Sequence, residues 1–315
     1  MSLPDEYLQY PHRKHGMDQD RYAWRLSIDR PRTDWPGGKA LACLIVVPIE
    51  HHMLNPSGKP FKHPGAMQTP YPDLRHYTTR DYGNRVGVYR ILDALAAAGL
   101  KATFPINAAQ IVRLAPLVKA IVEEGHEIAA YGWDTDSIHW GGLDTEAEQV
   151  LVARTRTAFE TAGLAPRTWM SPARQQSFRT PDLIRAAGFD VCLDWEIDNV
   201  PVAMRTEAGP LSCVPLFNEL DDRKLLIDQR QTEAEWRDQI LEAAALSKSE
   251  HPRFGGQVLS FTLTPYVSGQ PFRNWALRET LAALGADGDV WSATASEIAD
   301  AGARANSSDA RGAVP

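Results

Sequence analysis

A short stretch of the sequence, residues 125–140 (GHEIAAYGWDTDSIHW), carries its densest set of side chains able to do chemistry. Residues 127–130 have the length and apolar character of a buried strand. Polar and aromatic side chains follow at once: Tyr131, Trp133, Asp134, Asp136, His139 and Trp140. A connecting turn does not need so many rings and carboxylates, so we interpret the stretch as a strand that leads into a ligand-binding loop.

A second set, Glu50, His51 and His52, follows the apolar run ALACLIVVPI at residues 40–49. That run is typical of a strand buried on both faces. A carboxylate and an imidazole can act as acid and base near neutral pH. Successive strand residues point to opposite faces, so the three side chains cannot all face one ion while the strand persists.

The elements that position these residues alternate along the chain. Strands are predicted at 40–49, 101–106, 127–130, 168–171, 191–195, 211–215, 258–264 and 289–292, and helices at 86–98, 116–124, 144–161, 181–188, 233–247 and 272–284. The crossovers are too long for hairpins, which implies parallel strands in a barrel or a doubly wound sheet. Neither GxGxxG nor GxxxxGK[ST] occurs, so a nucleotide site has no support and we favour the α/β barrel.

The amino-acid composition argues against several classes of binding partner. A net charge of −7 argues against nucleic acid or an anionic membrane as the main partner. No window approaches the roughly 20 apolar residues of a membrane span, and the N-terminal residues lack a signal-peptide core, so we expect a cytoplasmic protein. Cys43, Cys192 and Cys213 lie in apolar runs without CxxC spacing, which predicts buried structural cysteines.

Three regions are expected. Residues 1–38 are polar and rich in Pro and Arg, with aromatics that suggest an arm lying on the body or on a neighbouring subunit: Tyr7, Tyr10, Tyr22, Trp24 and Trp35. Residues 39–300 form a single barrel domain, in which the long loop 53–84 is expected to be functional. Residues 301–315 are small and polar, which predicts a flexible tail. The exposed aromatics also favour a homo-oligomer, a dimer or tetramer.

In an α/β barrel the active site lies at the carboxyl ends of the strands. These positions hold Glu50, His51, His52, Asn107, Tyr131, Trp133, Asp134, Ser171, Arg174, Asp194, Trp195, Asp198, Thr264 and Tyr266.

The order of KATFPIN, GHEIAAYGW, SPARQQSFRTPDLIRAAGFD and TLTPYVSGQPFR resembles the polysaccharide deacetylase (NodB-homology) superfamily over residues 40–299. The pieces RDYGNRVGVYRILD, LDWEIDNVP and GPLSCVPLFNELDD look closer to the branch with metal-independent allantoinases, whose members look like tetramers. The resemblance implies a distorted (β/α) barrel of about seven parallel strands.

Departures from the family pattern concern its metal site. VPIEHH stands where the deacetylases have TFDD, Tyr131 and Thr135 stand at the two metal histidines, and Thr264 replaces a later histidine. Tyr and Thr are poor zinc ligands, so we predict no metal and no other cofactor. A zinc site rebuilt from Glu50, His51, His52 and Asp134 is the weaker alternative.

We therefore expect a hydrolase of a non-peptide C–N bond in a small cyclic amide, ureide or imide. Glu50, with a pKa raised by burial, would activate water or protonate the leaving nitrogen. Arg174 and the backbone of residues 171–173, with Ser171, would hold the oxyanion. The remaining roles are a ring-stacking surface from Tyr131, Trp133 and Trp195, and polar contacts from Asn107, Asp198, His51, His52, Asp134 and Thr264.

Structural roles compete with each of these. Glu50 would then pair with Arg80 or Arg85, Arg174 would anchor its loop, Trp133 and Trp195 would be core, and Asp134 would be a turn residue. Two other functions stay open: an inactive barrel that binds a small molecule, and a metal-dependent N-deacetylase of an N-acetyl sugar.

Overall fold

The computed structural model describes residues 21–23, 25–57, 70 and 72–309. Its strands are β1 (Leu41–Val46), β2 (Thr103–Ile106), β3 (Glu127–Ala130), β4 (Thr168–Trp169), β5 (Val191–Cys192), β6 (Val202–Met204), β7 (Leu211–Cys213), β8 (Gln257–Thr262) and β9 (Val290–Ser292). Its main helices are α2 (Leu74–Tyr82), α3 (Val88–Ala98), α4 (Ala115–Glu123), α5 (Thr145–Thr161), α6 (Thr180–Ala186), α7 (Glu233–Phe254), α8 (Asn274–Ala286) and α9 (Ala295–Asp309). Short helical turns include a π-helical segment, η2 (Gly83–Gly87), between α2 and α3, and a second one, η6 (Arg223–Asp228), after β7.

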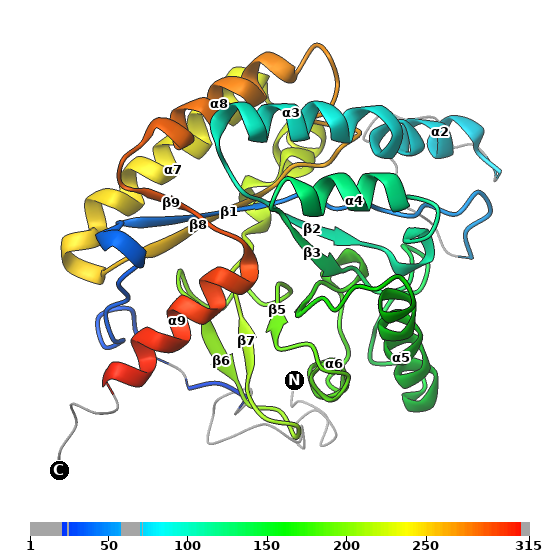
Figure 1. Ribbon diagram of the computed structural model, residues 1–315, viewed down its shortest axis with the longest axis horizontal. Helices are drawn as coiled ribbons and strands as arrows, with labels where there is room; N and C mark the ends of the chain where they lie inside the picture. The colour runs from blue at the N-terminus through cyan, green and yellow to red at the C-terminus, as the bar shows by residue number, and fades with distance from the viewer. Residues whose placement is uncertain (1–20, 24, 58–69, 71, 310–315) are drawn as a thin grey trace, which may run out of the picture.

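The strands form one α/β sheet in the order β6-β7-β5-β4-β3-β2-β1-β8, with β9 paired to β1, and helices cover the outside of its curve (Figure 1). All pairs are parallel except β6 with β7. The predicted barrel class is confirmed. The prediction of parallel strands alone was wrong at β6, because the connection from Met204 to Leu211 is short enough for an antiparallel pair.

The sheet is a half-barrel with a seam between its end strands, β6 and β8, and aspartate side chains cover part of the β8 side of this seam. Backbone N–H groups of β8 and its extension point across this seam. Asp221 accepts the N–H of Thr262 at 3.1 Å, and Asp222 accepts that of Thr264 at 2.7 Å. These carboxylates satisfy donors that a missing strand would otherwise pair.

The core lies between the sheet and the helices. Every residue of β1 is buried, as its continuous apolar sequence predicts, and the three cysteines are buried as well. Helix α5 begins with its Asp144 cap, as predicted. Helix α2 was not expected, because its sequence has no apolar stripe.

The ends of the described chain pack on the body. In the predicted arm, Trp35 is buried and donates to the carbonyl of Gln257 at 2.9 Å, while Tyr7, Tyr10 and Trp24 lie outside the described residues. Residues 301–309 of the predicted flexible tail belong to α9. Ala301 is buried, and Gly302 lies so close to Pro201 that a Cβ would come within 2.9 Å of that ring. Within the described residues, we find no helix with the length and hydropathy that a membrane crossing requires.

Candidate active site

The chain beyond β1 is fixed to its neighbours before it reaches the first site residue. Ile49 forms a bridge with Ile106, at the end of β2. The next carbonyl, that of Glu50, accepts hydrogen bonds from the amides of Asn84 at 2.8 Å and Gln110 at 2.7 Å. Glu50 therefore has a defined backbone position at the carboxyl edge of the sheet.

The side chain of Glu50 joins an imidazole and a phenol. One carboxylate oxygen, Oε2, lies 2.9 Å from Nε2 of His52, and the other accepts the Tyr131 hydroxyl at 3.3 Å. The backbone of His51 is fixed as well: its N–H donates to the Asn107 side chain, and its carbonyl accepts the Thr135 hydroxyl. The sequence-predicted residues Glu50, His52 and Tyr131 thus come together.

Two arginines surround this carboxylate. Burial alone would raise the pKa of Glu50, but the hydrogen bond and charge of His52 and the charges of Arg223 and Arg80 lower it to about 2. The predicted raised pKa was therefore wrong: Glu50 is buried as expected, yet cations outweigh desolvation. Arg85, the other predicted partner, instead lies 3.6 Å from Asp81 on the surface.

Two phenols complete the cluster. Burial, together with the charge of Glu50, raises the pKa of Tyr131 well above its usual value, and burial and Glu50 also raise the pKa of Tyr266. The Tyr266 ring lies 5.2 Å from the guanidinium of Arg80 and 6.4 Å from the His52 ring. Both phenols are consequently neutral hydrogen-bonding groups at physiological pH.

The hydrogen-bonded pair of Glu50 and His52 opens onto a small pocket. Residues from α2, η2 and the ends of β1 and β2 line it: Glu50, His51, His52, Tyr77, Asp81, Asn84, Gln110 and Arg113. The side chains of His52 and Glu50 retain 13% and 11% exposure, which is enough for solvent or a ligand to contact them.

Several predicted ligand-binding residues serve the scaffold instead. The amide of Asn107 is buried, accepts the N–H of His51 at 2.7 Å and donates to the carbonyl of Tyr131. Asp134 accepts the N–H groups of Asp136 and Ser137, as a turn residue does. These side chains connect the ends of β1, β2 and β3.

The remaining predicted residues lie in other contacts. Arg174 donates to the carbonyl of Leu216 and to Glu196, so it anchors its loop rather than facing Glu50. The guanidinium of Arg154 covers the Trp133 ring at 3.4 Å. Four further residues bond within the protein: Ser171 to Asp194, Trp195 to Gln176, Asp198 to Arg30, and Thr264 to Asp222.

Arg223 is the site residue that sequence reasoning missed, whereas Arg80 was expected only as a structural partner of Glu50 and Tyr266 only as a strand-end residue. Arg223 follows two aspartates in NELDDRK and resembles part of a solvated charge run. Arg80 lies in α2, where no helix was predicted. Tyr266 is at a strand end but had no distinctive spacing. Only the fold brings them to Glu50.

The residues present do not fit a metal held in the way that the superfamily pattern implies. Tyr131, at the place of the first histidine, is a neutral phenol bound to Glu50, and the hydroxyl of Thr135 donates to His51 at 2.7 Å. Among the described residues no group of three His, Cys, Asp or Glu side chains is arranged to hold an ion. The donor set therefore suits proton transfer better than zinc.

Known proteins share this fold. The sequence pattern of the polysaccharide deacetylase family matches residues 70–192. A structure described as a polysaccharide deacetylase from Pseudomonas aeruginosa PAO1 superposes with a TM-score of 0.79 and 21% identity, covering 89% of this chain and 98% of that one. The structure of PuuE allantoinase superposes with a TM-score of 0.78 and 21% identity, covering 88% of this chain and 96% of that one.

A third structure, described as a polysaccharide deacetylase from Mycobacterium smegmatis, gives a TM-score of 0.70 and 25% identity over 91% of this chain and 96% of that one. No curated protein matches by sequence. The resemblance predicted from the sequence is confirmed by the family match and by these folds.

Proposed function

We propose that this protein, whose fold resembles that of polysaccharide deacetylases and whose residues 70–192 match that family, hydrolyses a C–N bond in a small cyclic amide, ureide or imide without a metal. The structural likeness to a protein named an allantoinase supports a ring-opening reaction. The observation that carries the proposal is the Glu50–His52 pair, which lines a pocket at the carboxyl ends of the strands.

His52, rather than Glu50, is the proposed base. A carboxyl group with a pKa of about 2 stays ionised and binds protons too weakly to serve as base or acid near neutral pH. As an anion at Nε2 it favours the imidazole tautomer with hydrogen on that nitrogen. Nδ1 is then the proton acceptor, and Glu50 stabilises the imidazolium that forms.

The proposed reaction adds one water across the bond. His52 removes a proton from water as the oxygen attacks the carbonyl carbon, and the carbonyl oxygen becomes an oxyanion. His52 then returns this proton to the ring nitrogen as the C–N bond breaks. The products are a carboxylic acid and an amine or urea, joined where the ring was cut.

Charge on the oxyanion requires a donor, and Arg223 replaces Arg174 in this role. Its guanidinium is buried beside Glu50, Tyr131 and Tyr266, whose negative or polar groups keep its pKa raised despite the burial. Arg174 is already bonded to Leu216 and Glu196. A preorganised donor of this kind is worth about 3 kcal/mol in the transition state.

The test is a hydrolysis screen by mass spectrometry on purified protein, with cyclic ureides, imides and hydantoins beside N-acetyl sugars, with and without a chelator. Gain of one water on a cyclic amide, unchanged by chelator, is the expected result. Loss of acetyl that a chelator abolishes would favour the N-deacetylase. If no compound is hydrolysed but one of them still binds, the result would favour an inactive barrel that binds a small molecule.

A matched pair of variants then assigns the base. His52→Ala should abolish turnover, and added imidazole should restore part of it because it can occupy the vacated space. His251→Ala, in the last turn of α7 and outside the residues that line the pocket, should retain most of the activity. Equal losses in the two variants would contradict the assignment to His52.

The cytoplasmic location and the homo-oligomer remain predictions. Light scattering of the purified protein measures the number of subunits directly. A monomer at micromolar concentration would remove the dimer or tetramer from the proposal.

A further inference from the structure

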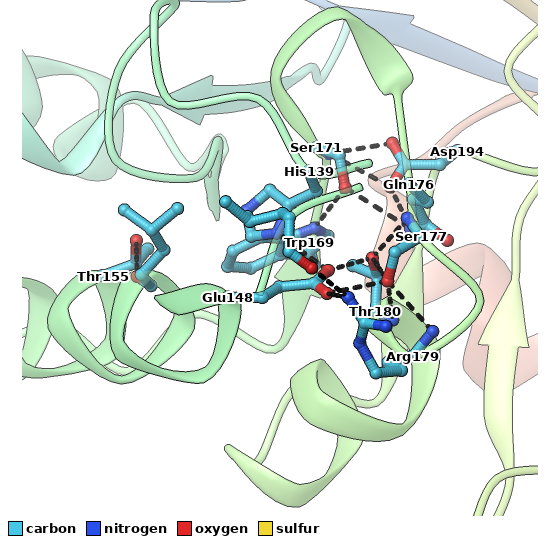
Figure 2. A network of polar contacts seen from close by, with 12 residues as sticks. His139, Glu148, Thr155, Trp169, Ser171, Gln176, Ser177, Arg179, Thr180 and Asp194 are labelled. Atoms are coloured by element: carbon cyan, nitrogen blue, oxygen red, sulfur yellow. Dashed lines mark hydrogen bonds and ion pairs between the residues drawn. The ribbon is translucent and has the colours of Figure 1, made fainter. Parts of the chain in front are cut away.

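A second glutamate, Glu148 in the first turn of α5, lies at the centre of another polar network (Figure 2). Its carboxylate accepts the hydroxyl of Thr180 at 2.5 Å and that of Ser177 at 2.7 Å. Nδ1 of His139 lies 3.2 Å away, and the guanidinium of Arg179 lies at 3.3 Å. The side chains of Glu148 and His139 are 0% and 1% exposed.

These partners come from two loops at the carboxyl edge of the sheet. His139 belongs to the β3 loop, residues 131–144, which begins with Tyr131. Ser177 and Arg179 belong to the β4 loop, residues 170–179, which leads into α6 at Thr180. Arg179 also donates to the carbonyl of Leu143 at 2.6 Å, so the two loops are joined twice.

The β4 loop in turn holds a third carboxylate. Asp194, after β5, accepts the N–H of Ser171 at 2.9 Å and the amide of Gln176 at 2.5 Å (Figure 2). The ring of Trp169 packs edge-on against His139 at 5.6 Å and donates to the Ser171 hydroxyl at 2.8 Å. Contacts therefore run without a break from Glu148 to Asp194.

Asp194 acts on the proposed site through its charge. After burial and the charge of Glu50, its charge contributes to raising the pKa of Tyr131, whose hydroxyl binds Glu50. A change in the position of Asp194 or of the β3 loop would alter the phenol that fixes the Glu50–His52 pair. Side chains placed about 1 Å from their productive position can cost a hundredfold in rate.

We propose that Glu148 is a positioning residue for the reaction at Glu50 and His52, because its carboxylate fixes the β3 and β4 loops to each other and thereby sets Tyr131 and Asp194. This inference rests on the proposed function. Glu148 contacts no residue of the pocket and takes no part in proton transfer. A glutamate with three partners from the two loops and a fourth, Thr180, at the start of α6 is what such a role requires.

The kinetic test uses Thr180, because loss of one hydroxyl is milder than loss of a buried charge. Thr180→Val removes the 2.5 Å bond to Glu148 in nearly the same volume, and Thr180→Ser keeps the hydroxyl. Thr180→Val should lower kcat about 10- to 100-fold with a smaller change in KM, and Thr180→Ser should restore it. Unchanged kcat per folded molecule in Thr180→Val, with reduced unfolding stability alone, would overturn the proposal.

A second measurement does not depend on turnover. Hydrogen exchange of Glu148→Gln should be faster in residues 131–144, 170–179 and around Asp194 than in the wild type. Glu146→Gln, an exposed change in the same helical turn, is the matched control and should leave these peptides unchanged. Unaltered exchange in both loops would overturn the proposal. Failure of the wild type to open any ring would instead contradict the proposed function.

Discussion

Two buried glutamate–histidine pairs in this chain have the same chemistry but different surroundings. Glu50 lies 2.9 Å from His52, and Glu148 lies 3.2 Å from His139. Burial would raise the pKa of either glutamate, yet hydrogen bonds and charges lower both to about 2. The first pair lines a pocket, whereas the second is sealed.

The partners of each pair account for the difference. Glu148 is surrounded by Ser177 and Thr180, short hydroxyl donors that satisfy it in place and bind loops together. Glu50 lies among the charges of Arg223 and Arg80 beside a solvent-accessible imidazole. A carboxylate–imidazole pair is therefore suited to catalysis where its histidine can contact a ligand, and to a structural role where donors of the protein surround its carboxylate.

The largest expected effect is on catalysis at the first pair. Glu50→Gln removes the charge that orients His52 and stabilises its imidazolium, so kcat/KM should fall ~10²- to 10⁴-fold. Steady-state kinetics on a ring-opening substrate from the screen measures it, with Glu146→Gln as the surface control. Retained activity in Glu50→Gln would end the distinction between the two pairs.

Stability should respond most at the second pair. Glu148→Gln breaks a sealed ion pair and should lower the free energy of unfolding by about 3–5 kcal/mol. The loss in Glu50→Gln should be smaller, because solvent reaches that pair. Urea unfolding of both variants gives the comparison, and a larger loss in Glu50→Gln would reverse the roles argued for them.

Acid should lower the contribution of both glutamate–histidine pairs to the free energy of unfolding. The pKa of each glutamate is near 4.5 when unfolded and about 2 when folded, so its contribution is present above pH 4.5 and is lost as pH falls toward 2. For the fully buried Glu148 this amounts to at most about 3 kcal/mol. Urea unfolding between pH 5 and pH 2.5 should show a shallower decline in Glu148→Gln. An identical decline in the variant would show that protonation of Glu148 does not contribute to the pH dependence of stability.

The smallest effect concerns Asp222, a buried carboxylate that accepts hydrogen bonds from Thr264 and Ser268. Burial raises the pKa of Asp222 at the seam from 3.8 to about 7. A raised carboxyl pKa favours the folded state at low pH, so this contribution is lost as pH rises from about 4 through 7. Asp222→Asn should remove part of the decline in unfolding free energy between pH 5 and 8, on the order of 1 kcal/mol. If the variant's free energy of unfolding declined as steeply as that of the wild type, the pH dependence would come from other groups.

Local patterns were sufficient for most of the fold. Continuous apolar runs located β1, β3 and β8, and the cap at Asp144 and the glycine after Ala98 set helix ends correctly. Hydrophobic periodicity did not predict α2, which lacks an apolar stripe, or β6, where Ala203 is exposed.

The site was predicted only in part. Its location at the strand ends and the nearness of Glu50, His52 and Tyr131 followed from the barrel rule and from side-chain alternation. The scaffold roles of Asn107 and Asp198 did not, because their partners lie 24 and 168 residues away in the sequence, and for Arg174 the sequence left loop anchoring and oxyanion binding as alternatives.

The sequence by itself determined the elements, their parallel order and the residue types at the edge of the sheet, because hydrophobic periodicity and strand alternation are local properties. Only the tertiary structure decided which charges meet. Whether Glu50 holds a proton depends on the balance between desolvation and the fields of Arg223, Arg80 and His52. Arg223 and Arg80 belong to segments distant from Glu50 in the sequence. Because Coulomb interactions depend on distance in space, the sequence alone does not give their effect on its pKa.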